Sequence, residues 1–178
     1  MSQGIVANRT DRKRWSDRFL HQYQIILGKW AGCAPEEVII ANDDDDRKNA
    51  TDLILPDGRR VAAKTRRKNV LLSYPTEIAL RHNPNARYPS EWKKVLNNKA
   101  QLLLYTYCDI LEQRLIKWRI CDLGVLTLAH LFDFDGCIKP VEQHDDDRDV
   151  HLIAFDGLSI QKKYGKLLLA SGIDTLSA

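Results

Sequence analysis

Residues 49–68 read NATDLILPDGRRVAAKTRRK and predict a tight hairpin that carries one acid and one lysine. The apolar run LIL is typical of a short buried strand, the PDG that follows is a turn sequence, and residues 59–67 alternate as a returning strand does. Pairing across this turn would bring Asp52 and Lys64 together at one end of a sheet.

An acid beside an ammonium group can support phosphodiester hydrolysis with a divalent cation. Mg²⁺ takes oxygen ligands and keeps several waters, so one or two carboxylates and a substrate phosphate suffice to hold it. The Lys64 ammonium can orient the attacking water or stabilise the negative charge that develops during the reaction. The hairpin therefore predicts the site of a metal-dependent nuclease.

This arrangement resembles the PD-(D/E)XK nuclease superfamily, in which an aspartate begins one strand and an acid-x-lysine triplet lies on the next. Asp52 matches the first position and Lys64 the last. The triplet itself reads Ala62-Ala63-Lys64, so alanine stands where the middle acid is expected. The resemblance implies that Asp52 binds the metal and that Mg²⁺ or Mn²⁺ is the cofactor.

Three explanations for Ala62 remain open. Either another element supplies the missing acid, or the domain is an inactive relative that only binds nucleic acid or a protein, or the resemblance is accidental. Some members of the superfamily carry an acid on a neighbouring element, which makes Glu91 and Glu77 candidates. We favour Glu91, so the predicted catalytic residues are Asp52, Lys64 and Glu91, with Asp52 and Glu91 as metal ligands.

Hydrophobic periodicity predicts the order of elements. It indicates a helix at residues 16–32, strands at 38–41, 53–55, 59–67 and 77–81, a long helix from Ser90 whose apolar face reaches Leu103 and Tyr107, and a strand or strand pair at 114–126. This order is similar to the αβββαβ restriction-endonuclease-like core, which the resemblance places at residues 16–126. The hairpin and the start of the helix at Ser90 are also similar to small phage and prophage proteins of this kind.

The predicted fold is therefore α/β, with a mixed sheet flanked by helices. A chain of 178 residues suits a single domain at residues 1–178. Residues 127–178 form an acidic C-terminal extension, loop-rich up to a strand at 151–155 and followed by a helix at 160–170.

Other acidic positions are weaker candidates for a site. The aspartate run at residues 43–46 predicts a solvated loop, with Asp46 a minor candidate ligand. Asp17 fits a first-turn partner of the helix dipole better than a catalytic acid. His144 lies among acids, but its spacing fits no metal site.

Positive charge gathers around the hairpin. Residues 58–108 carry eleven Lys and Arg against two acids, whereas the segments before and after are net acidic and the whole chain is only +3. Such a concentration favours a polyanion, and we expect DNA as the partner. The predicted phosphate contacts are Arg59, Arg66, Arg67, Lys68, Arg81 and Arg87.

The remaining expectations concern compartment and assembly. The four cysteines form no CxxC pair, and no stretch reaches the length of a membrane span, so we expect a cytoplasmic protein, in the host cytoplasm if the chain is phage-encoded. The resemblance admits a homodimer, because resolvases of this class are usually dimers. The alternatives to a nuclease are a nuclease-fold protein that binds without cutting and a structural or inhibitory protein that works through its acidic tail.

Overall fold

The computed structural model describes residues 15–42, 44, 51–73, 75–82, 90–97, 99–132, 138–145 and 148–173. Along the chain these residues form α2 (Leu20–Ala31), the 3-10 helix η1 (Pro35–Glu37), β1 (Ile39–Ile40), β2 (Leu53–Ile54), β3 (Arg60–Arg67), α4 (Lys68–Ser73), β4 (Glu77–His82), α5 (Glu91–Leu96), β5 (Leu102–Cys108), β6 (Leu115–Asp122), α6 (Leu123–Phe132), β7 (Ile138–Asp145), β8 (Arg148–Asp156), α7 (Gly157–Tyr164) and β9 (Leu168–Ile173).

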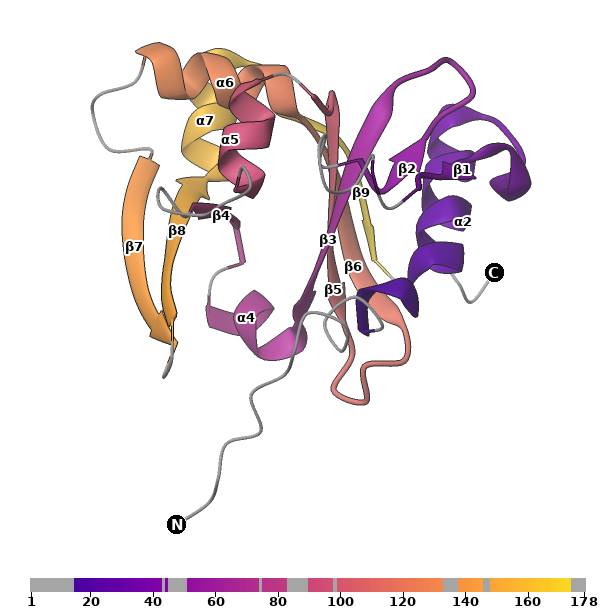
Figure 1. Ribbon diagram of the computed structural model, residues 1–178, viewed down its shortest axis with the longest axis horizontal. Coiled ribbons are helices and arrows are strands. Elements are labelled where there is room, and N and C mark those ends of the chain that lie inside the picture. Colours follow the sequence, from indigo (N-terminus) through magenta and orange to yellow (C-terminus); the bar gives the residue numbers. More distant parts are fainter. Residues whose placement is uncertain are drawn as a thin grey trace.

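The strands form two sheets. The larger has the order β1-β2-β3-β5-β6-β9, and the smaller has the order β4-β8-β7. All neighbouring strands are antiparallel except β3 and β5, which run parallel. In Figure 1, α2 covers one side of the large sheet, while α5, α6, α7 and the small sheet lie on the other. The expectation of a mixed sheet flanked by helices is confirmed.

The hairpin predicted from residues 49–68 is present. Leu53 pairs with Val61, and the Gly58 N–H donates to the Leu55 carbonyl at 2.9 Å. Gly58 has a φ of 85°, a left-handed conformation that glycine adopts at no steric cost. This turn sets the register of β2 against β3, and therefore the position of every side chain on β3.

Side chains of β3 alternate between two apolar clusters. Val61 and Ala63 pack into the cluster beneath α2, and the Thr65 hydroxyl hydrogen-bonds to that of Tyr23 on α2. Ala62 instead packs into the cluster formed with α5, α6, α7 and β4. Because strand side chains alternate, Lys64 and Arg66 extend from the same face as Ala62.

The prediction of one long helix from Ser90 to Tyr107 is wrong. The helix α5 ends at Leu96, and Leu102–Cys108 is the strand β5, paired with β3 on one side and β6 on the other. All seven residues of β5 are buried. A strand covered on both faces is apolar throughout, so its sequence lacks the alternation that distinguishes a strand from a helix.

Three predictions for the C-terminal part of the chain also differ from the structure. Residues 114–126 are not all strand, because β6 ends at Asp122, whose carboxylate accepts the Gly124 N–H at 2.7 Å as α6 begins. The helix expected to reach residue 170 ends at Tyr164, and β9 follows. The acidic stretch expected to be loop contains the strand β7. The strand expected at residues 151–155 lies within β8, so that prediction is confirmed.

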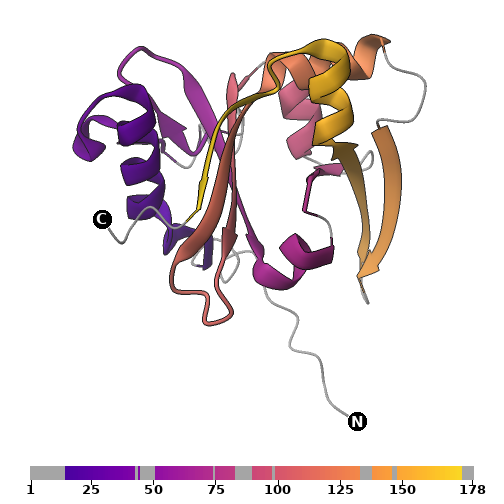
Figure 2. The ribbon, with the colours of Figure 1, turned by 180° about the vertical axis from the view of Figure 1, so that it is seen from behind.

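In Figure 2, β9 forms the edge of the large sheet next to β6. The last strand of the described chain therefore belongs to the large sheet rather than to a separate extension. Among the described helices, none is long and apolar enough to cross a membrane.

Helix α2 is held close to the turn that follows it. A Cβ added at Gly28 would lie 2.9 Å from the Cys33 carbonyl oxygen and 3.2 Å from the Pro35 nitrogen. Both are backbone atoms, so the crowding cannot be relieved by rotating a side chain.

We therefore expect Gly28→Ala to destabilise the protein by about 1–3 kcal/mol, although alanine is the better helix former. Denaturant unfolding measures this change. The exposed helix substitution His21→Ala is the control and should shift stability by no more than about 0.5 kcal/mol. A Gly28→Ala variant more stable than the wild type would contradict the close approach.

Candidate phosphate-handling site at Lys64 and Glu91

Lys64 on β3 and Glu91 on α5 form an ion pair that links the large sheet to this helix. The Lys64 side chain is 14% exposed and that of Glu91 is 35% exposed. Ser90 caps α5 by accepting the Lys93 N–H at 3.4 Å, which fixes Glu91 as the first residue of the helix. The Glu91 Oε2 atom also accepts the Arg81 backbone N–H at 2.9 Å, so three elements meet at this carboxylate.

Both charges have shifted pKa values. Burial lowers the pKa of Lys64 to about 8, and the Glu91 carboxylate only partly opposes this shift. Burial alone would raise the pKa of Glu91, but the Lys64 ammonium and the Arg81 guanidinium together lower it to about 2. Glu91 is therefore ionised at neutral pH. The lowered pKa of Lys64 brings the release of its proton close to the neutral range.

Asp52 lies at the start of β2, as predicted, and is fastened to the backbone of β3. Its N–H donates to the Val61 carbonyl at 2.9 Å, and its Oδ2 accepts the Ala63 N–H at 2.7 Å. Burial raises the pKa of Tyr23, and the charge of Asp52 adds to that increase. The electrostatic influence of Asp52 thus reaches the α2 side of the sheet.

The structure distinguishes between Glu91 and Glu77, the two acids considered as substitutes for the carboxylate that is missing at position 62. Glu91 contacts Lys64. Glu77 begins β4 and is paired in register with Asp156 of β8. Ala62 itself is half-buried against the apolar cluster on the Lys64 face.

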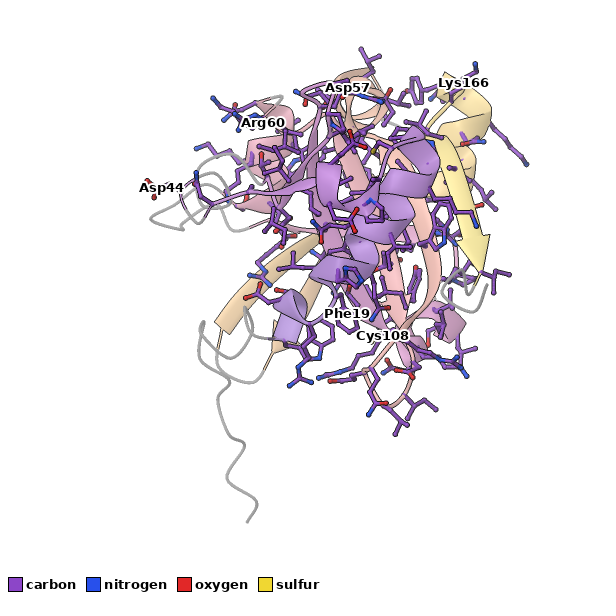
Figure 3. All side chains as sticks on the ribbon, turned by 90° about the vertical axis from the view of Figure 1, so that its right-hand side faces the viewer. Phe19, Asp44, Asp57, Arg60, Cys108 and Lys166 are labelled. Carbon is purple, nitrogen blue, oxygen red and sulfur yellow. The ribbon has the colours of Figure 1, made fainter. Side chains whose placement is uncertain are left out.

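Two of the predicted phosphate contacts, Arg59 and Arg67, lie at opposite ends of β3. Arg59, at the turn end, pairs with Asp57 at 2.7 Å and stacks on the ring of Trp30 at 4.9 Å. Arg67, at the other end, pairs with Glu112 and lies over Trp15. Figure 3 shows Asp57 at one end of the sheet and Cys108, the register partner of Arg67, at the opposite end.

The other predicted cations occupy different surroundings. Arg66 donates to the Tyr105 hydroxyl and to the Ala79 carbonyl, each at 3.1 Å. Lys68 begins α4, and Arg81 lies on β4 with its guanidinium close enough to lower the pKa of Glu91. Arg87 lies outside the described residues.

Among the weaker candidates, the structure describes the side chain of Asp17. Asp17 is exposed, at the start of the described chain near α2. Asp46 and the side chain of His144 lie outside the described parts of the chain. Of the aspartate run at residues 43–46, only Asp44 is described.

Sequence reasoning missed a second group of side chains on the Lys64 face. The strand register places Lys64, Tyr105 and Arg119 in one row and Arg66, Tyr107 and Lys117 in the next. The alternating segments Tyr105-Thr106-Tyr107 and Lys117-Trp118-Arg119 carried this signal. It was hidden because β5 was predicted to be helical.

Within the described part of the chain, no group of three or more His, Cys, Asp or Glu side chains could hold a metal ion. A Mg²⁺ ion that is held by one or two carboxylates, waters and a substrate phosphate needs fewer protein ligands than such a group provides. Glu91 can provide one such ligand. Its Oε2 atom accepts the hydrogen bonds from Lys64 and from the Arg81 N–H, and its Oε1 atom has no hydrogen-bond partner among the described residues.

Comparisons with protein-family models, with curated proteins and with solved structures found no match to this chain.

We expect the Lys64–Glu91 pair to be strongly coupled. Glu91→Gln leaves a largely buried ammonium without its counter-ion and should cost about 1–3 kcal/mol, less than a fully buried pair because Glu91 is partly exposed. A double-mutant cycle with Lys64→Met should give a coupling energy above about 1 kcal/mol. The same cycle on the exposed pair Arg67–Glu112 should give less, and equal couplings would contradict the burial of the first pair.

The two pKa shifts also predict how stability depends on pH. The pKa of Glu91 falls from 4.5 to about 2 on folding, so its stabilisation is complete above pH 4.5 and is lost as the pH falls towards 2. The pKa of Lys64 falls from 10.5 to about 8, so stability should rise between these two values. The free energy of unfolding should be measured across this pH range. The loss of stability at acid pH should disappear in Glu91→Gln, and the rise in stability at alkaline pH should disappear in Lys64→Met.

Proposed function

We propose that this protein is a metal-dependent deoxyribonuclease whose chemistry is centred on Lys64 and Glu91. The contact between these two side chains is the observation that carries the proposal. It joins an ammonium of depressed pKa to an ionised carboxylate that still has one oxygen available for a ligand.

The order of the elements supports the same class. A helix, three antiparallel strands, a helix and a strand parallel to the third follow one another as α2, β1, β2, β3, α5 and β5, with α4 and β4 inserted before α5. This is the order αβββαβ that the resemblance to PD-(D/E)XK nucleases implies. The final strand is β5 rather than the predicted segment at residues 114–126.

Under this proposal each residue of the site would have its own role. Glu91 would ligate the divalent ion through Oε1, and Asp52 would be the second carboxylate. A bound Mg²⁺ or Mn²⁺ would polarise the phosphate and the attacking water. Lys64, with its pKa near 8, would position that water and stabilise charge on the phosphate oxygens. Arg81 would keep Glu91 ionised by lowering its pKa.

A second function, binding of nucleic acid without cleavage, is favoured by Ala62. A methyl group packed in an apolar cluster takes the place of the middle acid, and Glu91 is already neutralised by Lys64. A carboxylate committed to an ion pair binds a metal ion less strongly. Under this hypothesis Lys64 is simply one more cation for the phosphate backbone.

The experiment that separates the two is cleavage of linear, single-stranded, branched and supercoiled DNA with Mg²⁺ or Mn²⁺. We expect metal-dependent cutting by the wild type, reduced at least about 100-fold in Lys64→Met, Glu91→Gln and Asp52→Asn, because each removes a group that acts on the transition state.

Matched controls keep this result specific. Lys29→Met and Glu36→Gln remove the same charges at exposed positions of α2 and η1 and should cut like the wild type. DNA binding without metal-dependent cutting in the wild type would establish the second function. Cutting that survives in Glu91→Gln would remove Glu91 from the site.

A further inference from the structure

The side chain of Tyr107 buries a polar hydroxyl group. Tyr107 is 0% exposed, and its Oη makes no hydrogen bond within the described part of the chain. Leaving a buried hydroxyl unpaired costs free energy, so a site of this kind calls for a bound group that the hydroxyl can contact.

Three cations are neighbours of Tyr107 in the large sheet. Arg66 and Lys117 are the cross-strand neighbours of Tyr107 on β3 and β6, and the Arg119 guanidinium lies 6.0 Å from the centre of the Tyr107 ring. Among the described residues, none of the three forms an ion pair with a carboxylate. Glu77 is the acid that acts on Tyr107 from β4, so the cluster keeps an excess of positive charge.

The cations also repel one another. The pKa of Lys117 is lowered first by burial and then by the charge of Arg119. Burial raises the pKa of Tyr107 to about 12, while Arg119 and Arg66 act in the opposite direction. Like charges held together in a partly buried position are unfavourable unless an anion lies between them.

The guanidinium groups retain donors for such an anion. Arg66 uses two N–H groups, on Tyr105 and Ala79, and Arg119 donates to the Pro75 carbonyl. A guanidinium has five N–H donors in a planar arrangement that matches phosphate oxygens. An ordered water would satisfy the hydroxyl but not the three charges, and a metal cation would be repelled.

We propose that Tyr107, Arg66, Lys117 and Arg119 form a binding site for a phosphate group, separate from Lys64 and Glu91. The Tyr107 hydroxyl donates to one phosphate oxygen and the cations hold the others. Arg119 and Lys117 are only partly buried, so these two side chains provide the solvent-facing side of the site.

The position of this site suggests which phosphate it holds. The row Arg66–Tyr107–Lys117 lies two residues along the strands from the row Lys64–Tyr105–Arg119, a separation of roughly 7 Å. A nucleic-acid strand whose reacting phosphate contacts Lys64 would place another phosphate at Tyr107. This assignment to nucleic acid rests on the proposed function, whereas binding of free phosphate does not.

Thermal unfolding in phosphate, sulfate or chloride at matched ionic strength tests the site directly. At a concentration about tenfold above the dissociation constant, phosphate or sulfate should raise the Tm of the wild type by roughly 5 °C, and the rise should be lost in Tyr107→Phe and Arg119→Gln. Tyr107→Phe should fold at least as well as the wild type without phosphate, because it removes an unpaired hydroxyl.

Tyr164→Phe is the matched control, since the Tyr164 hydroxyl is also buried and has no hydrogen-bond partner among the residues that the structure describes, but lies on α7. It should keep the full response to phosphate. An equal rise in all variants would mean a general salt effect, and no rise in the wild type would mean that water fills the site. Either result would overturn the proposal.

DNA binding distinguishes the two sources of phosphate. Fluorescence anisotropy should show DNA affinity reduced about tenfold in Tyr107→Phe, with free phosphate competing in the wild type only. A phosphate response without any effect on DNA would overturn the assignment to nucleic acid and leave a site for free phosphate. A phosphate response in a protein that does not cut DNA would refute the nuclease while supporting the site.

Discussion

The parallel pairing of β3 with β5 is the constraint on which the site depends. Parallel neighbours cannot be joined by a tight turn, so the chain must leave the sheet after Arg67 and return before Leu102. That crossover contains α4, β4 and α5. It carries Glu91 and Arg81 to the face of β3 from which Lys64 extends, so the topology itself assembles the ion pair.

The two faces of β3 therefore have different chemistry. Towards α2, Val61, Ala63 and Thr65 are packed or hydrogen-bonded in a core. On the other face, Lys64 is balanced by Glu91, whereas Arg66 belongs to a cluster whose positive charge is not balanced. The metal site proposed at Lys64 rests on its ion pair with Glu91, and the phosphate site proposed at Tyr107 rests on the excess of positive charge beside it.

The sequence was informative where a pattern is local. The turn at residues 56–58 fixed the hairpin, and the serine before Glu91 correctly indicated the start of α5. It was misleading at β5, because a central strand is apolar on both faces and its pairing with β3 is a contact between distant segments. The tyrosine and arginine rows could not be assigned without that register. The resemblance made both Glu91 and Glu77 candidates for the missing acid, and the structure places Glu91, not Glu77, against Lys64.

The most direct test of the account is to locate a bound metal ion on the folded protein. Mn²⁺ added with a DNA that cannot be cleaved should broaden the backbone NMR signals of Asp52, Lys64, Arg81 and Glu91 most strongly, and Glu91→Gln should abolish that broadening. Broadening centred on the aspartate run at residues 43–46, or unchanged by Glu91→Gln, would contradict a metal-dependent site at Lys64 and Glu91.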